Sequence, residues 1–220
     1  MNKKGETGLI FKTFFSCPQT SEICKNSMNG LNDKTLQHFQ PLSCSSSIKD
    51  ALKPQWSEKE YIDSYIDAAI VLAQKNEELV KLQNPSVNYV LRKYYYTLPI
   101  VYLVRHSIEL TLKFAIEKSG FESKPIHKVS SLWQSFTSHL PKSLHPNDNK
   151  IKKQMQVFID IIKLLDDTEI NSRYSKDKAG QQTQNKFLWI NTVHLTKTCK
   201  EFITAILNVD YEYIRLSNAK

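Results

Sequence analysis

Glycine is scarce in this chain, accounting for only 5 of its 220 residues. Proteins built from many short strands use glycine at tight turns, so its scarcity favours helices over a turn-rich sheet. The chain also lacks a G-x-x-x-x-G-K-[ST] phosphate loop and an H-E-x-x-H zinc helix, which argues against a nucleotide-hydrolysing enzyme or a zinc hydrolase of the common types. We therefore predict an all-α protein without a cofactor.

Long apolar runs are missing as well. The strongest run, residues 98–104, has seven residues and ends at Arg105, whereas a membrane-spanning helix needs about 20. The apolar patch at residues 9–15 is interrupted by Lys12 and preceded by Glu6, unlike the unbroken core of an export signal. These features predict a cytoplasmic protein that does not cross a membrane.

The cysteines do not form a recognisable framework. The chain has 4 cysteines and no Cys-x-x-Cys pair, so reduced thiols are expected rather than a set of disulfides. A zinc site made by Cys17, Cys24, His38 and Cys44 is the alternative, but the spacing of these residues matches no common zinc motif. We predict no metal site.

Positive charge is in excess, because 30 Lys and Arg residues outnumber 22 Asp and Glu residues and give a formal net charge of +8. Such an excess favours phosphate-rich partners such as RNA over acidic proteins. The alternative is that the charge serves general solubility.

Helical periodicity is confined to the middle of the chain. Residues 1–54 are polar and predict an N-terminal extension that is weakly ordered or packed on the body, and residues 211–220 predict a C-terminal tail. Between them, residues 55–210 predict a bundle of about five helices. The last three are expected over about 128–140, 146–165 and 187–208.

Local end signals mark the first helix. Ser57 and Glu60 form an S-x-x-E capping box, so this helix should start at Ser57, and it should run to about Gln83.

The second helix should end at Lys118, with Gly120 as a left-handed cap. Its start is predicted either near Tyr89 or beyond Pro99.

Charged side chains gather on one strip of the second helix. At 100° per residue, Arg105, His106, Glu109, Lys113 and Glu117 fall within about 120° of one another. One interpretation is a solvated face held together by pairs four residues apart. The other is a functional groove in which His106 transfers protons and Arg105 holds a phosphate.

Two segments resemble a known family. Residues 105–113 (R-H-S-I-E-L-T-L-K), followed by His127-Lys128-Val129 and Leu132, resemble the R/H-x-x-E-L-x-L-K and H-x-L patterns of HEPN-like proteins. The resemblance implies a helical bundle of four or five helices, often dimeric. It also implies a role in bacterial toxin–antitoxin or antiphage systems, often as a metal-independent ribonuclease.

A basic segment follows at residues 171–180, in a polar stretch without apolar periodicity. It resembles an F-R-Y-P-x-D-x-x-G segment of some HEPN-like proteins. Arg173 can bind a phosphate through two N–H groups, Tyr174 can stack on a base, and the lysines attract a nucleic-acid backbone. The alternative is a solvated loop.

These features lead to two functional hypotheses. The first is a HEPN-like protein of a bacterial defence or toxin-type module that acts on RNA, as a metal-independent endoribonuclease, with a homodimer and a neutralising partner protein as expected associations. The second is a non-catalytic helical module that binds a nucleic acid, nucleotide or partner protein. The second is favoured by the lack of an Arg and His separated by four to six residues, a pair that active HEPN ribonucleases carry. The predicted catalytic residues are Arg105, His106, Glu109 and Arg173, and the predicted substrate-binding residues are Lys113, Tyr174, Lys176, Asp177 and Lys178.

Overall fold

A computed structural model describes residues 10–11, 15, 24–25, 57–81, 96–168, 179–180 and 189–219 of the chain. Within these ranges the fold is helical, which confirms the all-α prediction. The helices are α2 (Glu58–Lys81), α4 (Thr97–Lys118), α5 (Val129–Ser138), α6 (Pro146–Asp166), α8 (Thr192–Leu207) and α9 (Tyr211–Asn218). Two antiparallel two-residue strands, β1 (Cys24–Lys25) and β2 (Trp189–Ile190), accompany them.

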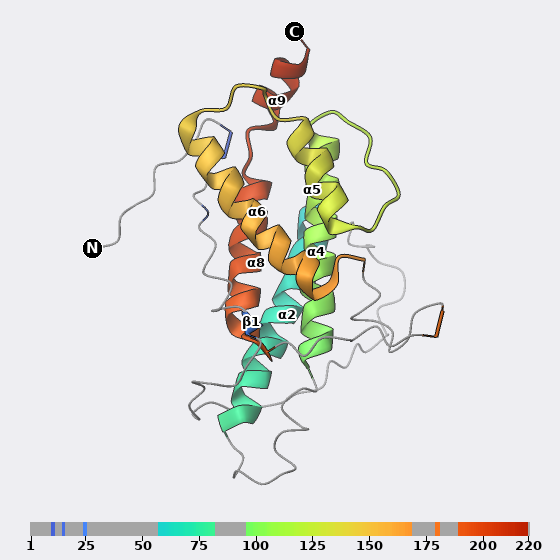
Figure 1. The fold of residues 1–220 in the computed structure, drawn as a ribbon, viewed down its shortest axis with the longest axis vertical. Helices are drawn as coiled ribbons and strands as arrows, with labels where there is room; N and C mark the ends of the chain where they lie inside the picture. Colours follow the sequence, from blue (N-terminus) through green and yellow to red (C-terminus); the bar gives the residue numbers. More distant parts are fainter. Residues whose placement is uncertain are drawn as a thin grey trace, which may run out of the picture.

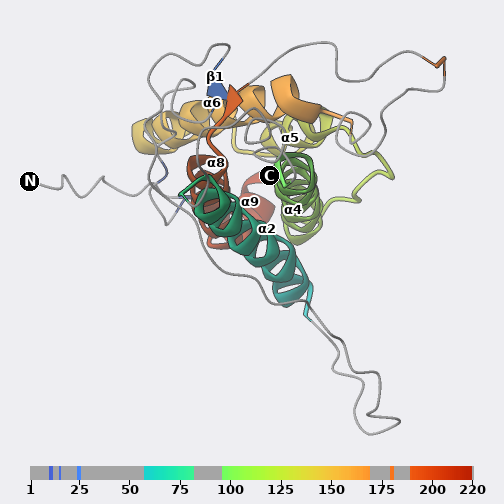
Figure 2. The ribbon, with the colours of Figure 1, turned by 90° about the horizontal axis from the view of Figure 1, so that it is seen from below.

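Three long helices, α2, α4 and α8, pack against one another, and α5 and α6 cover one side of this trio (Figures 1 and 2). Aromatic rings join the two layers. Phe158 of α6 lies 5.5 Å from Phe202 of α8 between ring centroids, and Trp133 of α5 lies 6.0 Å from the same ring. Helix α4 contacts α2, α8, α5 and α6, and its buried side chains include Val104, Ile108 and Leu112.

The predicted capping box is confirmed at the start of α2. The Ser57 backbone N–H donates to Glu60 Oε2 at 2.8 Å, and the Glu60 N–H donates to Ser57 Oγ at 3.3 Å. These bonds satisfy two N–H groups that the first helical turn leaves without partners. The bonds that the Ser57 N–H and Oγ donate to the Glu60 carboxylate lower the pKa of Glu60. On the inner face of α2, Ile62, Ile66 and Ala69 are buried.

Helix α4 begins at Thr97, between the two predicted starting points, so the predictions of Tyr89 and of a start beyond Pro99 are both wrong. Pro99 fits in the first turn because the N–H groups there have no partner within the helix. At the other end Gly120 has a φ of +89°, as predicted. Bonds from Gly120 N to Glu117 O and from Phe121 N to Ile116 O form the glycine-dependent cap of the Schellman type.

Side-chain caps explain where the last helices of the bundle begin. Helix α6 starts at Pro146, with His145 Nδ1 accepting from the Asn147 N–H. Helix α8 starts at Thr192 rather than near Phe187, because Asn191 Oδ1 accepts from the His194 N–H and thereby ends the preceding β2 strand.

Both predicted flanking regions contribute residues to the core. Ile10 and Phe11 of the N-terminal extension are buried, and both of their N–H groups donate to the buried Asp148 carboxylate at 3.0 and 3.1 Å. The predicted C-terminal tail contains α9, whose Ile214 is buried. Among the described residues, none of the helices combines the length and the apolar character needed to cross a lipid bilayer.

Candidate functional site

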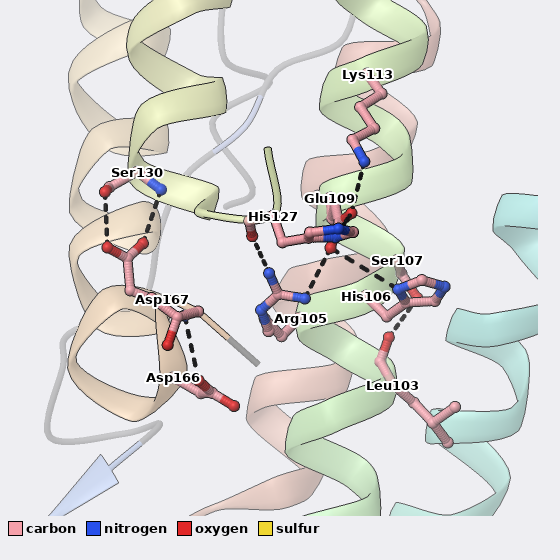
Figure 3. A network of polar contacts seen from close by, with 11 residues as sticks. Leu103, Arg105, His106, Ser107, Glu109, Lys113, His127, Ser130, Asp166 and Asp167 are labelled. Atoms are coloured by element: carbon pink, nitrogen blue, oxygen red, sulfur yellow. Dashed lines mark hydrogen bonds and ion pairs between the residues drawn. The ribbon is translucent and has the colours of Figure 1, made fainter. Parts of the chain in front are cut away.

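Two residues of the charged strip on α4 are buried rather than solvated. Arg105 is 0% exposed and Glu109 is 1% exposed, although both carry full charges. A solvated interpretation is therefore wrong for these two residues. Their burial follows from the position of α4 at the centre of the bundle, where α5 and the segment before it cover this side of the helix (Figure 3).

Glu109 is the centre of a polar cluster. Arg105 Nη1 donates to Glu109 Oε2 at 2.8 Å, and Lys113 Nζ donates to Glu109 Oε1 at 2.8 Å. These are the two pairs that the four-residue spacing predicts. The side chain of Lys113 keeps 23% of its surface exposed, so the cluster reaches solvent on this side.

A third partner, His127, comes from outside the helix. Its Nδ1 lies 2.8 Å from Glu109 Oε1, and its backbone carbonyl accepts from Arg105 Nη2 (Figure 3). The imidazole remains 58% exposed. His127 is not among the site residues that the sequence predicts. The signal that could have found it was its place in the H-K-V part of the family resemblance.

The segment that carries His127 is fixed at both ends. Gly120 turns the chain away from α4 at its start. At its end, the Asp167 carboxylate accepts from the Ser130 N–H and Oγ at 2.8 Å each, and the Asp167 carbonyl accepts from the Val129 N–H at 3.1 Å. These bonds cap the first turn of α5, which begins two residues after His127. His127 is therefore presented by a constrained backbone.

The partners of Glu109 keep it ionised. Burial raises its pKa, but hydrogen bonds from Lys113 and Arg105, together with their positive charges, outweigh that effect and lower the pKa below its usual value. An ionised carboxylate can only accept hydrogen bonds, so Nδ1 is the ring nitrogen through which His127 donates to Glu109. In the neutral imidazole this tautomer places the lone pair on Nε2.

His106 lies on the other side of Glu109. Its Nδ1 is 3.9 Å from Glu109 Oε2, and its side chain is 20% exposed. The ring packs edge-on against Tyr65 of α2 at a centroid distance of 4.6 Å and lies parallel to Tyr102 at 5.7 Å. The cluster thus holds two imidazoles within 4 Å of the two oxygens of one carboxylate.

The structure brings together Arg105, His106, Glu109 and Lys113, four of the nine predicted site residues. Glu117, the last residue of the charged strip, is exposed and accepts a hydrogen bond from Ser123 Oγ. The other five predicted site residues lie outside the described residues: Arg173, Tyr174, Lys176, Asp177 and Lys178.

No family model, no curated protein and no solved structure matches this chain. The HEPN-like assignment therefore rests on the sequence pattern alone and stays a prediction. The fold and the site together define a helical bundle whose central helix carries a buried carboxylate. That carboxylate binds an arginine and a lysine of the same helix and a histidine from the segment after it.

Proposed function

We propose that this chain is a HEPN-like helical protein of a bacterial defence or toxin-type module, and that it cleaves RNA without a metal ion. The observation that carries the proposal is the Glu109–His127 pair. A buried, ionised carboxylate holds an imidazole by Nδ1 while more than half of that side chain faces solvent. Carboxylate–imidazole pairs of this kind orient a general base.

The positive charge of the cluster suits a phosphodiester substrate. Arg105 and Lys113 contribute two positive charges and Glu109 one negative charge, which leaves an excess of one before either histidine is protonated. Lys113 is the cation of the pair with exposed surface, so we assign it to contact the phosphate. The buried Arg105 and Glu109 do not contact the substrate. They are positioning residues that hold His127 in place.

The geometry supports a specific reaction. His127 Nε2 takes the proton of a ribose 2′-hydroxyl, and the 2′-oxygen forms a bond to the adjacent phosphorus. The bond from phosphorus to the 5′-oxygen breaks, and protonated His106 donates its proton to that leaving oxygen. The products are a 2′,3′-cyclic phosphate and a 5′-hydroxyl end. Lys113 stabilises the negative charge that develops on the phosphate oxygens.

The test is cleavage of single-stranded RNA in the presence of a chelator. The wild-type chain should produce fragments with cyclic-phosphate ends, and His127→Ala should reduce the rate by about 100-fold or more, the usual contribution of a general base. Glu109→Gln should also slow cleavage, because an amide can present its N–H to His127 and reverse the tautomer.

His194→Ala is the matched control, since His194 is an exposed histidine on α8 that is not part of the cluster. It should cleave like the wild type. Fragments that persist unchanged in His127→Ala would contradict the proposed reaction, and so would a requirement for a divalent metal ion.

A second function, a non-catalytic binding module, is favoured by a different contact. Arg105 Nη2 donates to the backbone carbonyl of His127, so the cluster also fastens residues 121–128 onto α4. If fastening is its whole purpose, purified protein will leave RNA intact. In that case His127→Ala, which removes the side-chain contact with Glu109, will lower the melting temperature or the affinity for a partner, and no variant will cleave RNA.

A further inference from the structure

Next to the Glu109 cluster, four aromatic rings meet on the seam between α2 and α4. Tyr61 and Tyr65 come from α2, and Tyr102 and His106 come from α4, each pair four residues apart. Tyr61 and Tyr65 lie at a centroid distance of 5.3 Å with their planes 77° apart, so Tyr65 supports Tyr61 edge-on. His106 in turn packs edge-on against Tyr65 and parallel to Tyr102. The spacing of four places each pair on one face of its helix.

These rings are not part of the hydrophobic core. The buried face of α2 is made by Ile62, Ile66 and Ala69, whereas Tyr61 is 47% exposed. Tyr65 and Tyr102 are half-buried. A row of partly exposed aromatic rings that a core does not need is typical of a surface that stacks on a planar ligand.

We propose that Tyr61, supported edge-on by Tyr65, forms a stacking platform for an unpaired base of single-stranded RNA, with the backbone of that strand running along α4 toward Lys113. This inference rests on the proposed function and specifies its substrate class. Base faces are available for stacking only where a strand is unpaired, so the platform selects single-stranded RNA over a duplex.

The platform is held in place and carries no negative charge. The Tyr61 and Tyr65 hydroxyls are 3.2 Å apart, in hydrogen-bonding distance. This bond and the partial burial of Tyr65 raise the pKa of Tyr65 to about 12, so its ring is a neutral phenol beside a phosphate strand. Lys200 binds both of the nearby carboxylates, Asp63 and Asp67, at 2.8 and 3.0 Å, which offsets one of their two negative charges.

Lys113, the cationic end of the site, lies far enough along α4 from the aromatic rings to contact a neighbouring phosphate of the same strand. His106 and Lys113 are seven residues apart on α4, a rise of about 10 Å along the helix axis. Glu109 lies between His106 and Lys113 on α4. Arg105 and Lys113 neutralise its charge, so it does not repel a phosphate along this side of the helix. A strand can therefore place one base on the tyrosines and a neighbouring phosphate near Lys113 and His127.

The experiment measures binding separately from cleavage. The probe is a fluorescein-labelled, 2′-O-methyl oligoadenylate of about 12 nucleotides, which lacks the 2′-hydroxyl that the proposed reaction consumes. With the full chain, Tyr61→Leu should raise the Kd about tenfold, while Tyr61→Phe, which keeps the ring, should stay within about twofold. Tyr213→Leu is the matched control, because Tyr213 is a similarly exposed tyrosine on α9.

Salt dependence separates stacking from charge. Tyr61→Leu should leave the slope of log Kd against log salt unchanged, whereas Lys113→Gln should reduce it by about one phosphate contact. A duplex of the same length should compete poorly. The platform is overturned if Tyr61→Leu binds the probe like the wild type, if the duplex binds as tightly as the single strand, or if the probe does not bind.

The two proposals can fail separately. Binding that depends on Tyr61, without cleavage of unmodified RNA, keeps the platform and removes the proposed reaction. Cleavage that depends on His127, with probe binding indifferent to Tyr61, keeps the reaction and removes the platform. Melting temperatures of Tyr61→Leu and Tyr61→Phe identify any effect that comes from loss of folding.

Discussion

Two clusters in this protein join carboxylates to basic side chains at nearly the same distances, yet they differ in their surroundings. Glu109 accepts from Arg105 and Lys113 at 2.8 Å, and Lys200 of α8 donates to Asp63 and Asp67 of α2 at 2.8 and 3.0 Å. The Glu109 side chain is 2% exposed, whereas the two aspartates are 35% and 61% exposed.

The difference teaches that distance alone does not define the role of an ion pair. Around Lys200, water screens the charges, so the pairs add little to stability and the side chains are free to separate. Arg105 and Glu109 are shielded from water, so each of these two charges depends on its partners, and loss of one leaves the other uncompensated. A buried cluster can therefore fix the orientation of an imidazole, which an exposed one cannot.

The largest expected effect comes from breaking the buried cluster. Arg105→Met removes the cation with 0% exposure and leaves Glu109 short of one partner, so the free energy of unfolding should fall by about 3–5 kcal/mol. Urea unfolding measures this change. Combining it with Glu109→Met should cost less than the sum of the two single changes, and simple additivity would show that the two residues do not act together.

An acid titration should give an intermediate effect. Because the folded state lowers the pKa of Glu109, it binds fewer protons there than the unfolded chain, whose carboxyl titrates near ~4.3. The stabilisation is complete above that pH and is lost as the pH falls through the lower, folded pKa. The free energy of unfolding between about pH 5 and pH 3 should therefore decline less steeply in Glu109→Gln than in the wild type.

Glu117→Gln serves as the control for this titration, since it removes an exposed carboxylate from the same helix. An equal decline in Glu109→Gln and the wild type would argue that Glu109 is not held ionised by its partners.

The smallest effect is expected at the exposed cluster. Lys200→Gln should lower the free energy of unfolding by no more than about 1 kcal/mol, because its carboxylate partners are solvated. The loss should shrink further at high salt, where screening weakens exposed pairs. Urea unfolding at two salt concentrations tests this, and a salt-independent loss as large as that of Arg105→Met would remove the contrast between the clusters.

Local chemistry made several features predictable from the sequence. The capping box at Ser57 and Glu60 and the left-handed Gly120 depend on residues within a few positions of each other, so their bonds form wherever the helix ends there. The predicted starts of two helices were less accurate. Helix α4 begins at Thr97 because its first turn accommodates Pro99, and α8 begins at Thr192 because Asn191 caps it after a short strand.

The sequence by itself determined that Arg105, Glu109 and Lys113 share one strip of a helix, because helical geometry fixes which side chains at four-residue spacing meet. Only the tertiary structure decided that Arg105 and Glu109 are buried and that His127 joins them. Burial depends on which distant segment covers a helix face, and the contact between Glu109 and His127 spans 18 residues around a turn at Gly120. Periodicity describes one element at a time, so it carries no information about that covering segment.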